Sequence, residues 1–199
     1  MHYPNFESYI TALYQQFSEH DALQGDRLKR YRNIEPESAQ FLSMLIGIQQ
    51  SKEILEIGTS TGYSTLWLAE AAFKTKGRVV TLEIDPERSA QAATHALALG
   101  LKPIIDFRVV DALDYLKQCT KTFDFILLDA ERDAYVEYWQ YLPHLLNQKN
   151  GVFIVDNVIS HAADVQLFLQ QIEADANFIS HILPIGAGLL LVSYKSLSN

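Results

Sequence analysis

The chain has 199 residues, 48% of them hydrophobic, and a formal net charge of −8. This length and composition are typical of one domain with a substantial core, and the acidic balance argues against nucleic acid as a partner, because phosphate backbones are bound by basic surfaces. The single cysteine, Cys119, excludes an internal disulfide framework. Because no apolar run approaches membrane-spanning length and no leader-like segment opens the sequence, we expect a cytoplasmic protein without membrane contact.

The first fifty residues carry two helical patterns. Apolar residues recur at helical spacing from Phe6 to Phe17 and from Phe41 to Ile46, and we expect the second helix to begin after Pro36. The stretch RLKRYR between them is the basic exception in an acidic chain. It suits a solvated helix end, or a surface that meets an anionic substrate.

Beyond residue 50, short apolar runs alternate with helical patterns. The runs are EILEI, RVVTLEI, IIDFRVV, FDFILLD and GVFIVDN, and the helical patterns include STLWLAEAAF, ERSAQAATHALAL and AYVEYWQYLPHLL. This alternation predicts βαβ units and an α/β fold whose parallel sheet is covered on both faces. After a last helix from Val165 to Ile172, FISHILPIGAGLLLVSY predicts an antiparallel hairpin. We expect one domain over residues 1–199, with 1–50 as a helical cover and 51–199 as the core.

Five consecutive predicted strands end in acidic residues. In doubly wound sheets, ligands bind beyond the carboxyl ends of the strands. One acid at a strand end is well explained as a helix cap, because caps favour Asp and Asn, but five at the same edge predict a binding site. These acids are Glu56, Glu83, Asp111, Asp129 and Asp156, the last followed by Asn157.

The segment after the first strand, Gly58-Thr-Ser-Thr-Gly62, fits two motifs. G-x-S-x-G is the elbow of serine hydrolases, with Ser60 as nucleophile and with Asp156 and His181 in matching chain order. A glycine-rich turn at a helix start is also a cradle for a nucleotide-bearing cofactor, because free N–H groups and the helix dipole favour a carboxylate or phosphate. The two motifs predict different enzymes.

The cradle accounts for more of the sequence than the elbow does. The turn follows the first strand, whereas hydrolases build several strands before their elbow, and no HGGG-like oxyanion segment is present. Glu83 stands at the end of the next strand, where an acid takes ribose hydroxyls. A nicotinamide-dependent oxidoreductase would share that acid, although the full G-x-G-x-x-G is missing. We favour the cradle and keep the hydrolase and the oxidoreductase as alternatives.

In order along the chain, LEIGTSTGYSTLWLA, VVTLEIDPE, VVDAL, FDFILLDAERDAYVEYW and GVFIVDNV resemble the cation-dependent O-methyltransferases, the family of the catechol and caffeoyl-CoA O-methyltransferases. The similarity runs from about Asn33 to the C-terminal hairpin. It implies the Rossmann-like fold of S-adenosylmethionine-dependent methyltransferases, a doubly wound seven-stranded sheet of order 3-2-1-4-5-7-6 with one antiparallel strand.

The resemblance also implies where S-adenosylmethionine binds. Its methionine part would lie at the glycine-rich turn, Glu83 would hold the ribose, and Asp111 with Ala112 would flank the adenine. Asn33 and Ile34 match the family segment that closes over the methionine part. Helix initiation and an ordinary turn are the simpler explanations of these segments taken singly. The predicted cofactor-binding residues are Asn33, Ile34, Glu56, Gly58, Thr59, Gly62, Tyr63, Ser64, Glu83, Ile84, Asp111, Ala112 and Asp129.

Asp129, Asp156 and Asn157 form a second group. If the fourth and fifth strands are neighbours, their tips lie about 4.8 Å apart, so the three side chains can converge on one ion. Two carboxylates and an amide oxygen suit Mg²⁺ or Ca²⁺, whereas zinc is disfavoured because Cys119 is alone and the histidines lack ligand spacing. A loop cap explains Asp156-Asn157 in isolation, but with Asp129 alongside we favour a divalent cation.

The family implies in-line transfer of the sulfonium methyl to a small acceptor, an aromatic vicinal diol chelated by the cation. A metal-independent methyltransferase of the same fold stays open. Members commonly carry a lysine as general base where this chain has Arg132, whose guanidinium cannot accept a proton. Arg132 would stabilise an oxyanion or make a surface ion pair, and His161 is the nearest side chain with a suitable pKa. The predicted catalytic residues are Asp129, Arg132 and His161.

We also expect a homodimer. The opening helix and the C-terminal hairpin are predicted to expose apolar faces, and related bacterial members pair through such elements. A small-molecule methyl acceptor is the other expected partner. Its identity is not readable from the sequence, because the acceptor wall comes from the N-terminal segment and the loop around Ser160.

Overall fold

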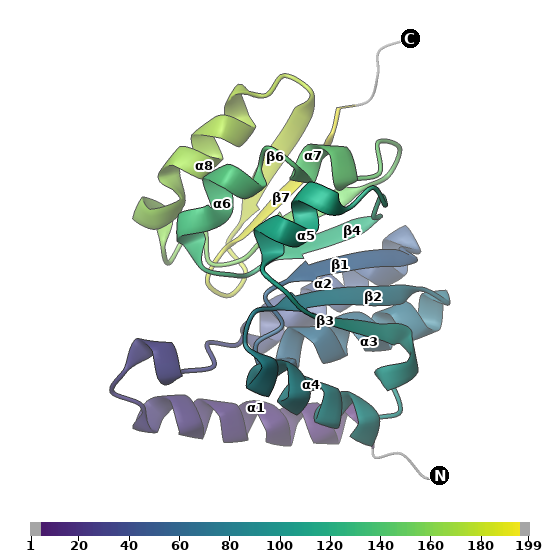
Figure 1. Ribbon diagram of the computed structural model, residues 1–199, viewed down its shortest axis with the longest axis vertical. Coiled ribbons are helices and arrows are strands. Elements are labelled where there is room, and N and C mark those ends of the chain that lie inside the picture. The colour runs from purple at the N-terminus through teal and green to yellow at the C-terminus, as the bar shows by residue number, and fades with distance from the viewer. Residues whose placement is uncertain (1–4, 196–199) are drawn as a thin grey trace.

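The computed structural model describes residues 5–195 and contains seven strands. They are β1 (Glu53–Ile57), β2 (Arg78–Glu83), β3 (Ile105–Val109), β4 (Phe125–Leu128), β5 (Val152–Val155), β6 (Phe178–Leu183) and β7 (Leu189–Tyr194). The strands form one sheet in the order β3-β2-β1-β4-β5-β7-β6 (Figure 1). The first five strands pair in parallel, and β7 runs antiparallel to both β5 and β6. The predicted sheet order and its one reversed strand are confirmed.

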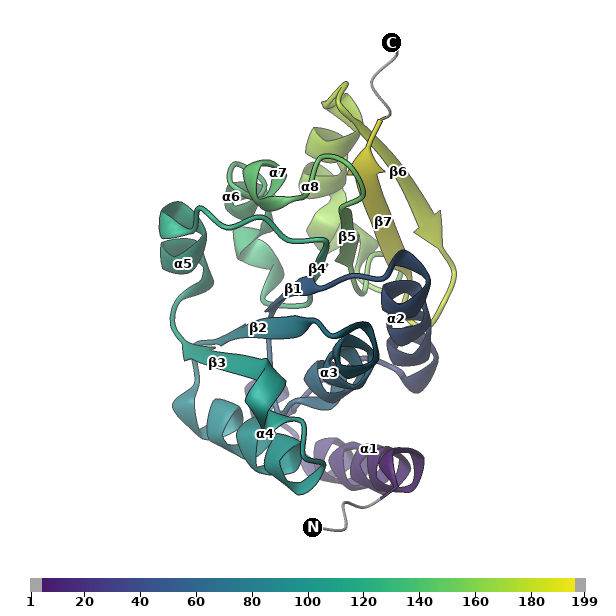
Figure 2. The same ribbon diagram turned by 90° about the vertical axis from the view of Figure 1, so that its right-hand side faces the viewer.

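Helices cover both faces of the sheet. On one face lie α2 (Pro36–Gln49), α3 (Tyr63–Thr75) and α4 (Pro86–Ala98), with α1 (Phe6–Leu23) outside them; on the other lie α5 (Ala112–Gln118), α6 (Tyr135–Tyr138), α7 (Leu142–Leu145) and α8 (Ala162–Ala174) (Figure 2). Short 3₁₀ turns are η1 (Arg27–Lys29), η2 (Lys102–Ile104) and η3 (Arg132–Ala134). Each layer of helices packs its own apolar cluster against the sheet. Within residues 5–195, none of the helices has the length and apolarity that crossing a membrane requires.

The central strands are apolar because both of their faces are covered. All four residues of β4 are buried, as are four of the five in β1, whereas the edge strand β6 is buried mainly at its first residue. After the carboxyl ends of β2 and β3 the chain turns into a helix. Asp85 and Asp111 cap α4 and α5 by accepting backbone N–H groups. Asp111, one of the five predicted strand-end acids, is therefore a helix cap, and so is Asp85, which follows Glu83.

Helix α1 packs its apolar face inside the chain. Ile10, Leu13 and Phe17 are buried, and the Tyr9 hydroxyl lies 2.8 Å from Nδ1 of His95 on α4. In Figure 1 this helix runs beneath α4 at the end of the molecule opposite the C-terminus. The expectation that the opening helix exposes an apolar face is therefore wrong, because its apolar stripe completes the layer of α3 and α4.

The stretch AYVEYWQYLPHLL, predicted as one helix, is divided into α6 and α7. Pro143 stands in the first turn of α7, where its missing N–H leaves no gap in the hydrogen-bond ladder. The hydroxyl of Tyr135 bonds the backbone of Ala130, accepting from its N–H and donating to its carbonyl at 3.1 Å each. The division lets Trp139 and Leu142 both turn into the core.

Candidate functional site

The turn between β1 and α3 is a backbone surface that only glycine permits. Gly58 and Gly62 have φ values of +105° and +93°. A Cβ on Gly58 would overlap the backbone oxygen of Asp129, and a Cβ on Gly62 would lie 2.6 Å from that of Ala92. Neighbouring residues therefore approach the turn closely, and among the described residues no side chain caps the first N–H groups of the 13-residue helix α3.

Glu56 lies under this turn and is fully buried. It accepts hydrogen bonds from the hydroxyls of Ser64 (2.5 Å), Thr65 (2.5 Å) and Thr81 (2.6 Å). Burial raises the pKa of Glu56 to about 7, and the three hydroxyls act in the opposite direction. Glu56 thus fixes the first turn of α3, and its predicted contact with a cofactor stays a prediction. Thr81 was missed, although a threonine inside the apolar run VVTLE was a signal for it.

Glu83, predicted to hold a ribose, lies against the same turn. One carboxylate oxygen accepts the backbone N–H of Ser60 at 2.7 Å, and the other accepts those of Ile84 and Asp85 at 3.0 Å each. The Ile84 side chain, assigned to the cofactor, is 69% exposed and leaves an apolar surface beside the carboxylate. The structure therefore places Glu83 and Ile84 together at the rim of the cradle.

Asp111 and Ala112, predicted to flank the adenine, lie where β3 leads into α5. Asp111 Oδ1 accepts the backbone N–H of Leu113 at 2.8 Å and that of Asp114 at 3.3 Å. The carboxylate is thus occupied as a helix cap. Its role toward a cofactor stays a prediction.

The segment between α1 and α2 crosses over the cradle. The Asn33 amide donates to the Thr61 hydroxyl at 3.2 Å, and the Ser60 hydroxyl donates to the carbonyl of Tyr31 at 2.8 Å. Ile34 is buried at 2% exposure. The structure thus brings Asn33 and Ile34 to the glycine turn, together with Thr59, Tyr63 and Ser64, which are all buried in or just after it.

Asp129, Asp156 and Asn157 meet where the parallel strands β4 and β5 end. Asn157, in a left-handed conformation with φ of 67°, donates through its amide to Asp129 Oδ1 at 3.2 Å and to Asp156 Oδ2 at 2.9 Å. Asp156 is fully buried, and none of the residues that the structure describes forms a hydrogen bond with its Oδ1. The three side chains therefore converge as the sequence predicted.

The electrostatics of this group fit a hard cation. Burial raises the pKa of both Asp129 and Asp156, and the charge of Asp129 raises that of Asp156 further. A divalent ion would neutralise the pair and occupy the unpartnered oxygen, and a rotated Asn157 amide would add its own oxygen. Across residues 5–195, no three His, Cys, Asp or Glu side chains are placed to hold a metal, so a cation here would rest on two carboxylates and one amide.

Glu35 is a third carboxylate beside this group. It is the N-cap of α2, and its Oε2 is buried with no hydrogen-bond partner among the described residues. Its charge raises the pKa of both Asp129 and Asp156. The sequence analysis missed Glu35. Its signal was weak, because an acid directly before a proline at a helix start is commonplace.

Arg132 and His161, predicted as catalytic, lie in the same electrostatic neighbourhood. Among the charges around Asp129, that of Arg132 lowers its pKa most, yet no residue between 5 and 195 forms a hydrogen bond or ion pair with the Arg132 side chain. The pKa of His161 is lowered by burial and then by Arg132, and its Nδ1 lies 2.9 Å from the Ser160 hydroxyl. The lowered pKa favours the neutral imidazole, the form that a general base requires.

The loop after Asn157 is held by the turn between β6 and β7. The N–H of Val158 donates to the carbonyl of Gly188 at 3.0 Å, and those of Ile159 and Ser160 donate to the carbonyl of Ala187 at 3.1 and 3.0 Å. A Cβ on Gly188, at φ of +98°, would overlap the Ile159 side chain. Ile159 is itself 50% exposed and stands beside the acidic group as a wall.

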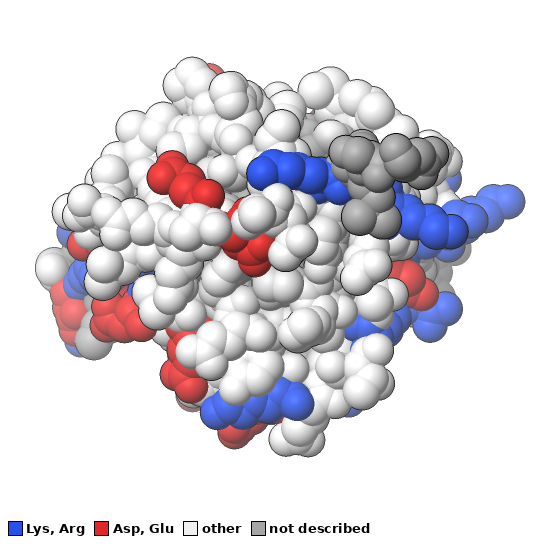
Figure 3. Space-filling view, turned by 90° about the horizontal axis from the view of Figure 1, so that it is seen from above, with Lys and Arg blue, Asp and Glu red and all other residues white. Residues whose placement is uncertain are grey.

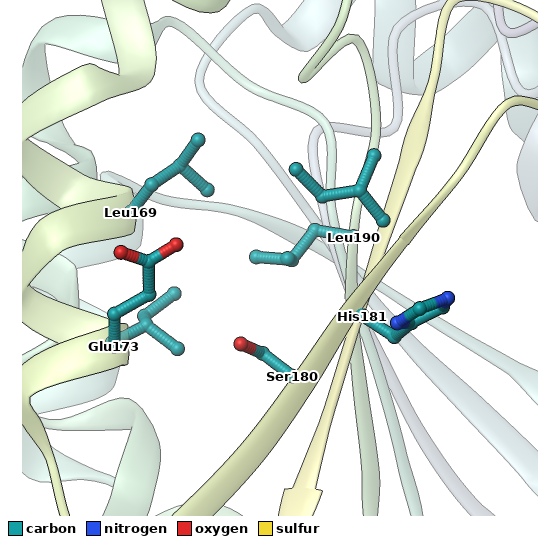
Figure 4. Close-up of a pocket in the computed structure, with 7 residues that line it drawn as sticks. Leu169, Glu173, Ser180, His181 and Leu190 are labelled. Carbon is teal, nitrogen blue, oxygen red and sulfur yellow. The ribbon is translucent and has the colours of Figure 1, made fainter.

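The serine-hydrolase alternative is not assembled. The Ser60 hydroxyl donates to a backbone carbonyl, Asp156 faces Asn157, and His181 lies on the edge strand β6. There His181 borders a cavity of about 300 Å³ against α8, and in Figure 4 its ring points away from Ser180 on the other side of the strand. Throughout the described chain, no contact joins Ser60, Asp156 and His181.

Residues 23–195 match the sequence profile of a family described as O-methyltransferase. A catechol O-methyltransferase of Niastella koreensis is 37% identical over 131 residues, covering 64% of this chain and 58% of that protein. One of Mycobacterium tuberculosis is 36% identical over 127 residues, covering 63% and 57%. The chain thus aligns with little more than half the length of these relatives.

Among solved structures, an O-methyltransferase of Bacillus cereus in complex with SAH has the same fold. It is 27% identical in sequence, with a TM-score of 0.78, and the match covers 94% of this chain and 91% of that one.

Proposed function

The chain belongs to the O-methyltransferase family, and we propose that it transfers the methyl group of S-adenosylmethionine to a hydroxyl of a small aromatic vicinal diol, assisted by a divalent cation. The observation that carries this proposal is the shared wall of the two sites. Gly58, in the cradle, touches the backbone of Asp129, in the acidic group. A methyl donor in the cradle therefore lies beside any acceptor held at Asp129, as in-line transfer requires.

The cofactor supplies an electrophilic methyl group. Around it, the backbone of Gly58 to Gly62 and the carboxylate of Glu83 would hold the nucleoside and amino-acid parts, while Asn33 and Ile34 exclude water from above. These contacts orient the donor. They take no part in proton transfer.

The cation, held by Asp129, Asp156 and Asn157, would lower the pKa of a bound hydroxyl. Arg132 stabilises the resulting oxyanion by its charge and cannot itself remove the proton. His161 would assist as a base: in the tautomer whose Nδ1–H donates to the Ser160 hydroxyl, its Nε2 can accept the acceptor's proton. This division of labour replaces the lysine that the sequence lacks.

The proposal is tested by methyl transfer from S-adenosylmethionine to 1,2-dihydroxybenzene with Mg²⁺ or Ca²⁺ and in excess chelator. We expect chelation or Asp156→Ala to abolish turnover, and Asp106→Ala, which removes an exposed acid on β3, to leave it intact. Full activity in chelator would support a metal-independent methyltransferase of the same fold. If S-adenosylhomocysteine did not stabilise the protein but NAD did, the oxidoreductase alternative would replace both.

We further propose a cytoplasmic homodimer formed through β6. Ile179 and Ile182 on this edge strand are 61% and 40% exposed, and Leu167 on α8 is 68% exposed. Figure 3 looks onto this end of the molecule and shows broad uncharged areas between scattered charges. An apolar edge strand suits an identical strand of a second copy. Light scattering at micromolar concentration should give a dimer mass, and Ile179→Lys a monomer; a monomeric wild-type protein would contradict the proposal.

A further inference from the structure

A hollow of about 450 Å³ lies between α1 and the segment that crosses the cradle. Its wall combines aromatic rings with guanidinium groups, and it reaches the predicted cofactor contact Asn33. The residues that matter here are Tyr14, Phe17, Asp21, Arg30, Arg32 and Asn33. None of the roles described above uses this hollow.

Arg32 is the residue in its wall with the most unfavourable placement. Its backbone adopts φ of 54°, a left-handed conformation that disfavours residues with a Cβ. Asp21 enforces this conformation by accepting the backbone N–H of Tyr31 at 2.7 Å and of Arg32 at 2.8 Å. In addition, the side-chain Nε of Arg32 is buried with no hydrogen-bond partner among residues 5–195. The left-handed backbone and the unpartnered Nε are both unfavourable, and their occurrence at one residue indicates that the side chain binds a ligand.

The carboxylates around Arg32 do not satisfy it. Asp21 spends its oxygens on backbone N–H groups, which also hold its pKa below the usual range. Glu131 accepts from Arg32 Nη2 at 2.5 Å and lies 3.7 Å from Arg27, and it leaves Nε open. Arg30 donates through Nε to the carbonyl of Gln24, and no described residue takes its terminal nitrogens. Arg32 Nε and the terminal nitrogens of Arg30 are therefore guanidinium donors without a described hydrogen-bond acceptor.

Building on the proposed methyl transfer, we propose that this hollow is the subsite for an anionic group, a carboxylate or phosphate, carried by the methyl acceptor. A guanidinium presents a planar fork that matches either group. Arg32 donates a hydrogen bond to Glu131, which stands two residues after Asp129. A substituent of an acceptor held at Asp129 can therefore reach Arg32. Tyr14 and Phe17 offer apolar walls to the acceptor body. The substrate class is then an aromatic vicinal diol with an acidic substituent.

The charge distribution of the chain favours such a ligand. The net charge is −8, yet Arg27, Lys29, Arg30 and Arg32 lie together in this segment. A positive cluster on an acidic protein attracts an anion to one place and leaves the rest of the surface unattractive to it. The alternative reading of RLKRYR as a merely solvated helix end does not explain the buried Nε of Arg32.

The test compares a matched pair of acceptors, 3,4-dihydroxycinnamate and its methyl ester, which differ in one charge. We expect the wild-type protein to prefer the acid in kcat/KM, and Arg32→Gln to lower the acid-to-ester ratio about 10- to 100-fold. Arg32→Lys, which keeps the charge but not the fork, should recover part of the ratio. Arg78→Gln, at the start of β2 and 69% exposed, is the matched control and should leave the ratio unchanged.

Calorimetry separates this inference from the proposed function. With S-adenosylhomocysteine bound, the acid should bind in an Arg32-dependent manner even if no diol is methylated. Equal ratios in wild type and Arg32→Gln, or no Arg32-dependent binding, would overturn the subsite. So would a loss of S-adenosylhomocysteine affinity with an unchanged ratio, because the hollow would then serve the cofactor. Benzoate and phenyl phosphate as competitors identify the group: the stronger one is the preferred anion, and competition by neither overturns the proposal.

Discussion

The cradle and the acidic group touch through Gly58 and Asp129 but are built differently. In the cradle, the buried carboxylate of Glu56 accepts hydrogen bonds from three hydroxyl groups. The carboxylate of Glu83 accepts hydrogen bonds from three backbone N–H groups. Around the acidic group, three buried atoms have no hydrogen-bond partner in the described part of the chain: Asp156 Oδ1, Glu35 Oε2 and Arg32 Nε. The carboxylates of the cradle thus have their hydrogen-bond partners in the folded protein, whereas the acidic group keeps atoms that a ligand could bind.

The difference corresponds to what each side is proposed to bind. A constant cofactor is served by fixed backbone and satisfied side chains, which hold its geometry without rearrangement. A cation and a varying acceptor are served by groups whose remaining bonds the ligands supply, at the expense of stability in their absence. Substitutions on the two sides should therefore have different consequences.

The largest effect is expected at the contact between the two sides. Gly58→Ala drives a Cβ into the Asp129 carbonyl at a φ that disfavours alanine, so it should destabilise the fold by about 3 kcal/mol or more and abolish S-adenosylhomocysteine binding. Gly47→Ala is the matched control, since nothing lies within 4 Å of its Cβ in helix α2, and it should be neutral or slightly stabilising. Denaturant unfolding measures both. Equal stability of the two variants would contradict the close approach.

On the cradle side, Glu83→Ala should weaken S-adenosylhomocysteine binding by about 1.5–3 kcal/mol, because the ribose hydroxyls lose a charged acceptor. Isothermal calorimetry measures the affinity. Glu87→Ala, an acid in the exposed first turn of α4, serves as control. An affinity that stays at the wild-type value in Glu83→Ala would remove this residue from the cofactor site.

The two sides should also respond differently to pH and cations. The pKa of Glu56 rises from 4.5 to about 7 on folding, so its contribution to stability is full below about pH 4.5 and is lost as pH rises through about 7. The raised pKa values of Asp129 and Asp156 act in the same direction. Thermal unfolding should therefore show the ligand-free protein losing stability over this range.

Mg²⁺ should restore the stability that is lost through Asp129 and Asp156 as the pH rises. Glu56→Gln should remove the pH dependence of stability that remains in the presence of Mg²⁺. These two effects should be additive, because Glu56 lies under the cradle and outside the cation ligands. A melting temperature independent of pH in wild type, or a Glu56→Gln protein as pH-dependent as wild type, would contradict the burial of this carboxylate in its charged form.

The smallest effect is expected at Ser60. Ser60→Ala removes one hydrogen bond to the Tyr31 carbonyl, about 0.5–1.5 kcal/mol, and leaves the backbone of the cradle in place. Most of the methyl-transfer activity should remain. Covalent labelling of Ser60 by a serine-directed phosphonate, detected by mass spectrometry, would instead restore the hydrolase interpretation.

The sheet order was predictable because its signals are local. Buried parallel strands appear as continuous apolar runs such as FDFILLD, and the turn residues between them mark each crossover. The division of α6 from α7 was not predicted, although Pro143 within the helical pattern was a signal for a helix boundary. The burial of α1 was not predicted, because the sequence pattern of an amphipathic helix does not determine which surface its apolar face packs against.

In the site, residues at strand ends were predictable, since parallel topology alone brings Asp129 and Asp156 to one edge. Residues whose role depends on the crossing segment were not. Arg32 was read only as part of a basic stretch, and Glu35 was not singled out, because their proximity to Asp129 exists only after α1 has docked. Long-range placement, rather than residue type, limited the prediction.

The loop from Val158 to Ser160 is held to the hairpin turn by backbone alone, through the carbonyls of Ala187 and Gly188. None of these three bonds uses a side chain, so a substitution at Ile159 can reshape the surface of the loop while its backbone frame stays in register. Gly188 is the exception, because any Cβ there displaces Ile159. A change of the Ile159 side chain could therefore alter which acceptor fits, whereas Ser160 must keep its hydroxyl to orient His161.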